Sequence, residues 1–338
     1  MDLRHNLFSY ATSELSQDAF ICWLMSFAMN DDNPDIALQK CAQDLIRQFL
    51  SVSSDTPIIV NDIERQIDHL DILLTVNNSY KIIIEDKTYT QEHDDQLNVY
   101  KKLVSEKYPE FIVVGVYFKI GFQSNYEIVD NSGYMRFCLD DILRTISKYQ
   151  DKTSNRIFLD YYEYLTNMKQ EINKFKVLPI SEWNWLQING FYEFAKNNKK
   201  NCMYYDYGYV HNQNGGFYGM WLYNNQYITL KSLKFELYLQ CEYVEQKMQI
   251  CYKASAQDED VKIKGTLRDK MIWKQQDDSK WRNLAKENNF FKPSRFGSGK
   301  TVTLGIFNTA PTDYEQLMKA IEDAVISFNN LTEDLLQE

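Results

Sequence analysis

Apolar residues in the first half of the chain change repeatedly between helical and strand spacing. Helical spacing predicts helices at residues 16–29, 35–50 and 91–107, and two more within 139–173. Runs of β-branched and aromatic residues predict strands at 58–66, 69–76, 81–87 and 110–119. This order of two helices, three strands, a helix and a strand predicts an α/β fold with a mixed sheet.

The helix expected at 91–107 has one apolar face. Leu97, Tyr100, Val104 and Tyr108 recur at intervals of three or four residues, which places them on the same side of a helix. We expect this face to lie on the sheet.

The pattern changes near Val177-Leu178-Pro179, where tyrosine-rich and asparagine-rich segments begin. A helix is expected at 181–199 and a final helix at 312–330. Apolar runs separated by turn residues predict strands at 202–211, 217–230, 233–244, 247–254 and 300–308. We therefore predict two domains, residues 1–178 and an α+β domain at 179–338.

Two of the expected strands form a hairpin. The runs HLDILLTV at 69–76 and YKIIIEDK at 80–87 are separated by the turn-forming residues Asn77-Asn78-Ser79. An antiparallel hairpin brings the start of its first strand beside the end of its second. Charged residues at those two positions should therefore meet at one end of the sheet.

Charged residues stand at these two positions. Asp71 opens the first strand, and Glu85 and Lys87 close the second. Side chains alternate along a strand, so those of Glu85 and Lys87 share a face about 7 Å apart. Carboxylate oxygens are the ligands that Mg²⁺ prefers, and an ammonium group stands beside them. The layout is typical of a metal-dependent phosphodiesterase.

The spacing of these residues resembles the PD-(D/E)XK nuclease superfamily. Asp71 matches the aspartate of the motif, and Glu85 and Lys87 match its (D/E)-x-K after a gap of thirteen residues. Leu70 stands where the motif name has proline. The segment EDKTYTQEHDDQLNVY resembles variants in which a glutamine on the next helix, here Gln96, borders the site. The resemblance covers roughly the first half of the chain.

The resemblance implies a restriction-endonuclease-like αβββαβ core and a nuclease that uses Mg²⁺ or Mn²⁺ and acts on DNA rather than RNA. The segment SELSQDAFICWLMSFA is similar to the first helix of these proteins, which contributes an acid, here Glu14; Asp18 in the same segment stays open. The implied catalytic residues are Asp71, Glu85, Lys87 and Gln96. The implied metal ligands are Glu14, Asp71, Glu85 and the backbone carbonyl of Asp86. Bacterial defence and repair are the implied settings.

Each of these residues also has a plainer interpretation. Charged residues at strand ends are commonly solvated, and a Glu-x-Lys pair on an exposed strand is often a simple ion pair. An acid near a helix start, such as Glu14, interacts favourably with the helix dipole. Gln96 has the alternative of a surface glutamine. The Ile-Ile-Ile run before Glu85 favours the catalytic interpretation, because a strand buried on both faces needs a reason to end in charges.

Composition and the lack of targeting signals are typical of a cytoplasmic protein with buried cores. The chain has 338 residues, and 44% hydrophobic content is ample for buried cores. It contains no run of about 18 apolar residues and no signal-peptide pattern, so we expect a cytoplasmic protein without membrane association. Six cysteines lack Cys-x-x-Cys pairs and four histidines lack ligand spacing, which argues against a zinc site.

Positive charge is concentrated in one stretch of an acidic chain. The net charge of the whole chain is −10, whereas residues 262–300 hold eleven Lys or Arg against four Asp or Glu. Aromatic residues lie between them, as in surfaces that neutralise phosphates and stack on bases. We take Lys292, Arg295 and Lys300 as the candidate nucleic-acid contacts. A solvated basic segment is the alternative.

Two other classes of function stay open. The chain is alternatively a non-catalytic module that binds or senses nucleic acid on a nuclease fold, or a protein-interaction subunit that acts through its second domain. The intact Asp71, Glu85 and Lys87 argue against the first of these. The sequence does not decide the oligomeric state, and a homo-oligomer stays among the alternatives.

Overall fold

The structure is a computed structural model of the chain. It describes residues 5–30, 35–88, 90–92, 95–198, 204–211, 215–230, 233–257, 283, 286–287, 289–291 and 300–336. These divide into two compact units, Met1–Gln170 and Glu171–Glu338. Within the described residues, none of the helices has the length and apolar character needed to cross a membrane.

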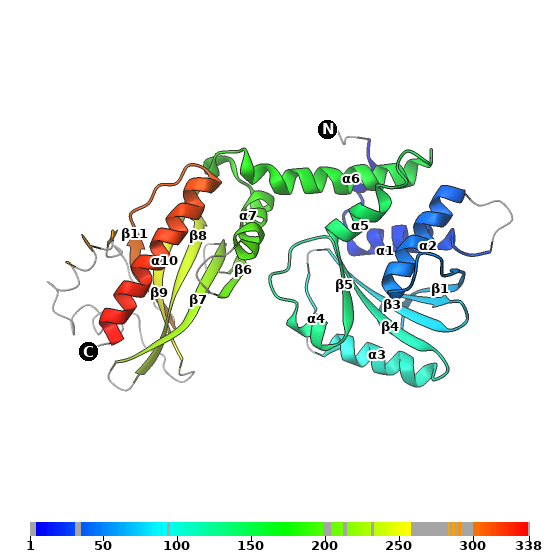
Figure 1. Cartoon of the computed structure of the whole chain (residues 1–338), viewed down its shortest axis with the longest axis horizontal. Coiled ribbons are helices and arrows are strands. Elements are labelled where there is room, and N and C mark those ends of the chain that lie inside the picture. The colour runs from blue at the N-terminus through cyan, green and yellow to red at the C-terminus, as the bar shows by residue number, and fades with distance from the viewer. Residues whose placement is uncertain are drawn as a thin grey trace. The chain divides into compact units, whose positions relative to one another are not determined.

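The first unit has helices on both sides of one sheet (Figure 1). Its helices are α1 (Glu14–Ser26), α2 (Ile36–Leu50), α3 (Gln96–Lys107), α4 (Glu127–Asn131), α5 (Leu139–Ile146) and α6 (Arg156–Asn173), after a short 3-10 helix at Leu7–Ser9. Its strands are β1 (Val60–Ile67), β2 (Leu70–Val76), β3 (Tyr80–Lys87), β4 (Ile112–Lys119) and β5 (Tyr134–Cys138). In Figure 1, α1 and α2 lie on one side of the sheet and α3 lies on the other.

The sheet of the first unit is mixed, as expected from the sequence. Its strand order is β1-β2-β3-β4-β5. The first three strands pair antiparallel, with Ile72 opposite Ile84, and β4 and β5 continue parallel to β3. Leu97 and Val104 of α3 are buried in one cluster with residues of β2 and β3, and Tyr100 and Tyr108 pack against it. The expected apolar face of this helix is confirmed.

Two elements of this unit were not expected from the sequence. The fifth strand, β5, pairs with β4, and the short α4 precedes it. The strand is only five residues long, YMRFC, and an arginine interrupts its apolar residues. Its place in the sheet therefore depends on pairing with β4, which local spacing does not reveal.

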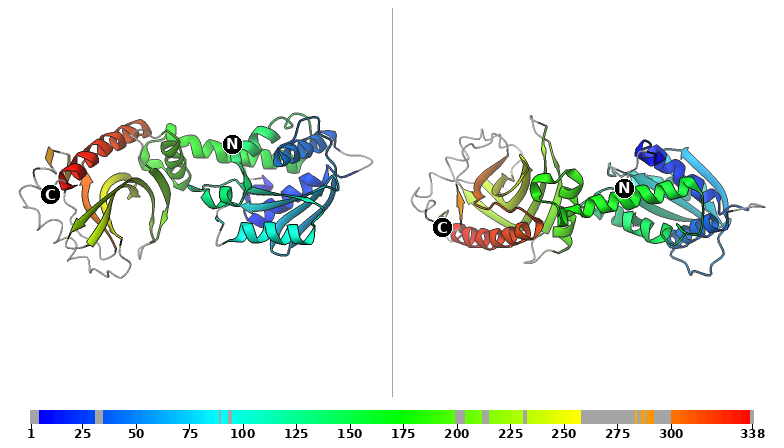
Figure 2. Two further views of the ribbon diagram at one scale, coloured as in Figure 1. Left: turned by 60° about the horizontal axis from the view of Figure 1, so that its bottom comes forward. Right: turned by 90° about the horizontal axis from the view of Figure 1, so that it is seen from above.

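Among its described residues, the second unit is a six-stranded antiparallel sheet with two helices packed against it. The helices are α7 (Trp185–Asn197) and α10 (Tyr314–Leu336), with 3-10 helices at Lys174–Lys176 and Ile180–Glu182. The strands are β6 (Tyr204–Val210), β7 (Phe217–Leu230), β8 (Leu233–Val244), β9 (Lys247–Ala256), β10 (Phe290–Phe291) and β11 (Thr301–Phe307), in the spatial order β10-β11-β9-β8-β7-β6. Figure 2 shows α10 lying across the strands.

The division between the two compact units falls inside α6, between Gln170 and Glu171. The physical reason is the packing of the last turn of α6 against α7. Gln187 Nε2 donates to the carbonyl oxygen of Glu171 at 2.6 Å. A Cβ at Gly190 would meet the carbonyl oxygen of Ile172 at 2.5 Å, so the glycine permits this close approach.

Candidate active site

The structure places Asp71, Glu85 and Lys87 at neighbouring strand ends. Asp71 is the second residue of β2, and Lys87 is the last residue of β3. The antiparallel pairing of Ile72 with Ile84 sets Asp71 beside Glu85. The long apolar stretch of β3 anchors the strand in the core and so fixes where its charged end lies.

The carboxylate of Glu85 is buried and held on one side. Its Oε1 lies 2.6 Å from Lys87 Nζ and accepts a hydrogen bond from Gln96 Nε2 at 2.7 Å. Gln96, the first residue of α3, also donates to the Tyr100 hydroxyl at 3.0 Å. The second oxygen, Oε2 of Glu85, is buried and has no hydrogen-bond partner among the described residues. The structure therefore brings Gln96 to the same point as the motif residues.

Asp71 is held by the backbone of β3 and by a side chain from β1. The backbone N–H of Asp86 donates to Asp71 Oδ2 at 3.0 Å. Gln66 Nε2 lies 3.4 Å from Asp71 Oδ1 and 3.1 Å from Asp18 Oδ2, so one amide spans two carboxylates. Gln66 has a φ of 54°, a left-handed conformation that is uncommon for a residue other than glycine.

The side chain of Asp86 faces the first helix. Gln17 Nε2 donates to Asp86 Oδ1, and the Tyr161 hydroxyl donates to Gln17 Oε1 at 3.3 Å. Within the part of the chain that the structure describes, Asp86 Oδ2 and Asp18 Oδ1 are buried without hydrogen-bond partners. The Asp86 side chain thus joins a polar cluster with Gln17 and Asp18 from α1.

Glu14 reaches the segment that follows β3. It occupies the first turn of α1, which is capped by Ser13. Its Oε1 accepts hydrogen bonds from the Thr88 backbone N–H at 2.9 Å and from the Thr90 hydroxyl at 2.7 Å. Burial alone would raise the pKa of Glu14, but these two hydrogen bonds and the charge of Lys87 together lower it.

The other carboxyl groups of the cluster show the opposite effect. Burial, followed by the charge of Asp71, raises the pKa of Glu85 to about 7. Burial and the same charge raise the pKa of Asp18 to about 6, and the pKa of Asp86 is raised well above its ordinary range by burial and by Asp18. Lys87 is also desolvated, but its ion pair with Glu85 leaves its pKa raised. The cluster holds more negative charge than its protein partners neutralise.

The donor set fits a divalent cation in its chemistry. One buried oxygen each of Glu85, Asp18 and Asp86 has no hydrogen-bond donor among the described residues. Carboxylate oxygens are hard ligands of the kind that Mg²⁺ takes. Among the described residues, no group of three or more Asp, Glu, His or Cys side chains is arranged to hold a metal ion. Glu14, Asp71 and Glu85 each direct at least one oxygen to a protein donor.

Gln17 and Gln66 of this cluster were not identified from the sequence, whereas Asp18 was considered and left open. Gln17 and Asp18 follow Glu14 by three and four positions, which places all three on one helix face, and this signal was available. Gln66 gave no such signal. Its position depends on a turn in which Gln66, Asp68 and His69 all have positive φ.

The expected nucleic-acid contacts are only partly described. Lys292 and Arg295 lie outside the described residues. Lys300 is exposed, and its carbonyl oxygen accepts a hydrogen bond from the Ala256 backbone N–H at 3.0 Å, just before β11 begins. The role of these three residues stays a prediction.

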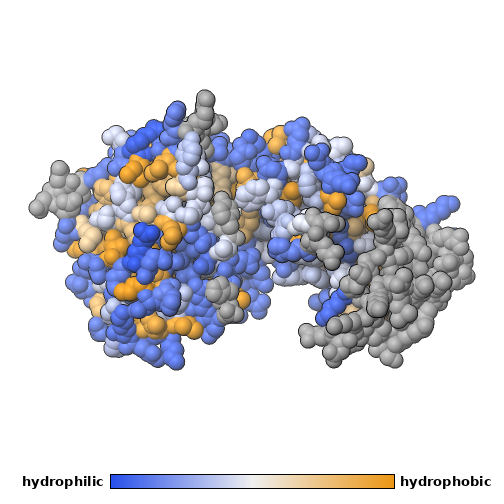
Figure 3. All heavy atoms as spheres, turned by 180° about the vertical axis from the view of Figure 1, so that it is seen from behind, coloured by the Kyte–Doolittle hydropathy of each residue, from blue (hydrophilic) through white to orange (hydrophobic). Residues whose placement is uncertain are grey.

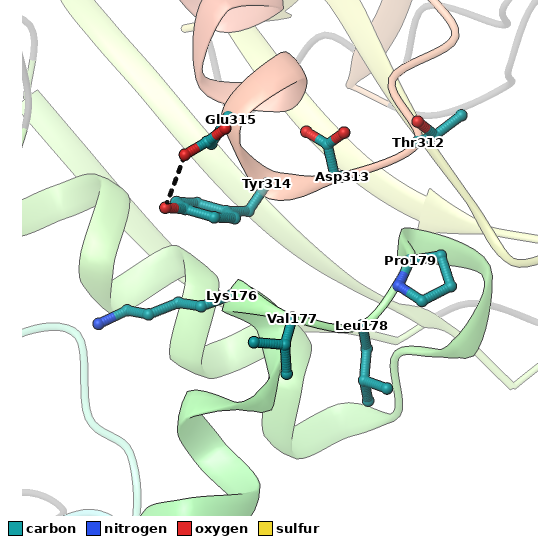
Figure 4. A pocket seen from close by; sticks show the side chains of 8 residues that line it. All are labelled: Lys176, Val177, Leu178, Pro179, Thr312, Asp313, Tyr314 and Glu315. Atoms are coloured by element: carbon teal, nitrogen blue, oxygen red, sulfur yellow. Dashed lines mark hydrogen bonds between the residues drawn. The ribbon is translucent and has the colours of Figure 1, made fainter.

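A pocket of about 480 Å³ lies in the second unit. Figure 4 shows its lining side chains, which come from the segments before and after the sheet: Lys176, Val177, Leu178, Pro179, Thr312, Asp313, Tyr314 and Glu315. None of them belongs to the acidic cluster. On the face of the molecule seen in Figure 3, apolar groups are scattered among hydrophilic ones, which is ordinary for a protein surface.

The fold and the cluster agree with one class of protein, the PD-(D/E)XK nucleases. A model of the PD-(D/E)XK nuclease superfamily matches residues 5–207, and the chain belongs to this superfamily. The match extends beyond the first unit, through α7 and into β6. No curated protein and no solved structure matches the chain. The superfamily generally comprises metal-dependent nucleases, which typically use Mg²⁺ or Mn²⁺.

Proposed function

We propose that this chain is a nuclease that uses Mg²⁺ or Mn²⁺ to hydrolyse phosphodiester bonds in DNA. The observation that carries the proposal is the state of Glu85. Its carboxylate is buried beside Asp71 and Lys87 at the end of β3, one of its oxygens lacks a partner, and its pKa is raised to about 7. A buried carboxylate whose negative charge is not fully neutralised lowers the stability of the fold. A binding site for a cation accounts for such a carboxylate at the end of a core strand.

The proposed fold of the first unit is the restriction-endonuclease-like αβββαβ core. Three antiparallel strands, the helix α3 and the parallel strand β4 support it, with α1 as the first helix. The second unit is proposed as an α+β domain that recognises nucleic acid or a partner. Lys292, Arg295 and Lys300 are its proposed phosphate contacts.

The proposed metal ligands are Glu14, Asp71, Glu85 and the backbone carbonyl of Asp86. When bound, a divalent cation supplies neutralisation of the phosphate charge and a more acidic water. The chain's own residues orient these groups. Gln96 holds Glu85 Oε1, and the Asp86 backbone N–H holds Asp71 Oδ2, so each of these acids is fixed through at least one oxygen.

Lys87 is the proposed catalytic cation. Burial alone would lower its pKa, but the ion pair with Glu85 raises it, so the side chain can donate a hydrogen bond at neutral pH. A fixed ammonium group stabilises the charge that develops on the phosphate in the transition state and orients the attacking water. Bacterial defence and repair are the proposed settings.

The decisive test is a cleavage assay with a parallel binding assay. The purified chain should cleave DNA with millimolar Mg²⁺ or Mn²⁺ and stop when EDTA is added, because all proposed ligands are oxygens. Filter binding is measured under both conditions. DNA binding without cleavage in either metal would instead support the non-catalytic binding module, and the absence of both would direct attention to a protein-interaction role.

The acidic cluster also predicts how stability depends on pH without metal. The pKa of Glu85 is raised from its ordinary 4.5 to about 7, and that of Asp18 from 3.8 to about 6. An acid whose pKa is higher in the folded state stabilises the fold fully below its unfolded pKa, and this stabilisation is lost as pH rises through the folded value. In EDTA, the melting temperature should therefore fall between about pH 4 and about pH 7, the range over which Asp18 and Glu85 ionise.

The matched control for this pH dependence is Glu85→Gln, which removes one of the titrating groups and keeps the size of the side chain. Its melting temperature in EDTA should fall less steeply over the same pH range, as followed by circular dichroism. If the parent and Glu85→Gln show equal slopes, the assignment of the pH dependence to this carboxyl group is wrong.

A further inference from the structure

Lys119, the last residue of β4, is fully buried. Its Nζ donates to two backbone carbonyl oxygens that follow β3, those of Thr88 at 3.3 Å and Thr90 at 2.5 Å. Among the described residues, no carboxylate forms an ion pair with it. Burial lowers the pKa of Lys119 to about 8, which leaves the side chain mostly protonated at pH 7. A buried cation that binds only carbonyl groups is costly and calls for an explanation.

The two residues that Lys119 holds are the two that hold Glu14. Thr88 donates its backbone N–H to Glu14 Oε1, and Thr90 donates its hydroxyl to the same oxygen. Each threonine therefore binds Lys119 through its carbonyl group and Glu14 through a donor. A single threonine therefore links Lys119 to the Glu14 carboxylate in each case.

The backbone of Thr88, just after β3, packs closely against Gly121, which follows β4. A Cβ at Gly121 would meet the carbonyl oxygen of Thr88 at 2.0 Å, so the glycine allows this carbonyl to reach Lys119. Glu92 is held further along. Its Oε2 accepts hydrogen bonds from the Tyr117 hydroxyl and from Gln123 Nε2, both at 2.8 Å. Side chains in and just after β4 thus anchor the segment at several points.

We propose that Lys119 is a positioning residue of the nuclease site, which fixes the segment after β3 so that Thr88 and Thr90 hold the Glu14 carboxylate in place. This inference rests on the proposed function, in which Glu14 is a metal ligand. Outer residues of this kind set metal affinity by orienting a ligand, and their loss typically costs about 10- to 100-fold in affinity or activity. Lys119 acts through the backbone and does not itself touch metal or DNA.

The main test compares Lys119→Met with Lys81→Met. Lys81 is also a buried lysine of this sheet, but it lies at the other end of β3, with Thr75 Oγ1 at 2.8 Å. Both substitutions keep an unbranched side chain and should lower the melting temperature. Only Lys119→Met should raise the Mg²⁺ concentration at half-maximal thermal stabilisation and at half-maximal cleavage, by about tenfold. Saturating Mg²⁺ should restore most of the cleavage rate.

A second pair of variants leaves the core untouched. Thr90 is exposed, so Thr90→Val removes the hydroxyl that binds Glu14 without disturbing burial. It should shift the Mg²⁺ midpoint in the same direction as Lys119→Met, and Thr90→Ser, which keeps the hydroxyl, should restore the parent value. If Lys119→Met fails to fold, this pair still tests the link from Thr90 to Glu14, and a Thr90→Val midpoint equal to that of the parent overturns the inference.

Hydrogen exchange without metal separates failure of this inference from failure of the proposed function. In EDTA, the Thr88 amide should exchange faster in Lys119→Met than in Lys81→Met, whether or not the chain binds Mg²⁺. Unchanged exchange, or a Mg²⁺ midpoint equal to that of the parent in Lys119→Met and Thr90→Val, overturns the inference. If the parent neither responds to Mg²⁺ nor cleaves DNA, the proposed function is wrong. Hydrogen exchange of the Thr88 amide then remains as the test of whether Lys119 anchors the segment after β3.

Discussion

Replacing Lys87 with alanine should reduce DNA cleavage at saturating Mg²⁺ by a factor of at least about 100. The ammonium group lies 2.6 Å from Glu85 and is nearly buried, so its charge acts at short range in a medium that screens it weakly. The loss should appear mainly in kcat, because the stabilised charge develops in the transition state. Single-turnover cleavage of a labelled duplex measures it.

Lys102→Ala is the matched control for this substitution. Lys102 lies on the exposed side of α3 and makes only a distant pair with Glu106 at 3.9 Å, so its loss should leave cleavage unchanged. Circular dichroism should show that both variants are folded. A Lys87→Ala protein that cleaves as fast as the parent would contradict the proposed role of Lys87 in catalysis.

Asp71→Asn should abolish the stabilisation that Mg²⁺ gives to the parent. A ligand at a hundredfold excess over its Kd adds about 2.7 kcal/mol to the free energy of unfolding, which corresponds to several degrees in melting temperature. Without metal, the variant should melt above the parent, because the charge of Asp71 adds to burial in raising the pKa of Glu85. Asparagine retains an oxygen that can accept the Asp86 N–H.

Asp68→Asn serves as the control for the metal response. Asp68 lies three residues before Asp71 but is exposed and pairs with Lys107 at 2.8 Å. Differential scanning calorimetry in EDTA and in Mg²⁺ should show the parent response in Asp68→Asn and none in Asp71→Asn. Equal responses in the parent and both variants would place the metal outside this cluster.

Strong local patterns located most elements of the first unit. The strands expected from apolar runs and the helices expected from spacing match the observed bounds of β1 to β4, α1 and α2 within three residues. The helix expected at 91–107 ends where α3 ends, but α3 begins only at Gln96. β5 was missed because its five residues become a strand by pairing with β4. In the second unit, the expected strands at 202–211 to 300–308 correspond to β6 to β9 and β11, whereas the two-residue β10 was missed.

The sequence by itself determined the family and the motif residues of this protein. Asp71, Glu85 and Lys87 stand at fixed distances along one hairpin, so a local pattern suffices to bring them together. Turn residues and alternating side chains, both local properties, set that geometry. The assignment to the PD-(D/E)XK nuclease superfamily follows from the same residues and is confirmed.

Only the tertiary structure decided which donor each acid takes. Gln17 meets Asp86 across 69 positions of sequence, and Glu14 meets Thr88 across 74. Such contacts depend on how α1 and β4 pack on β3, which no local spacing encodes. The same packing buries Lys119 against two carbonyl groups, and an isolated lysine at the end of an apolar strand shows nothing of this in the sequence.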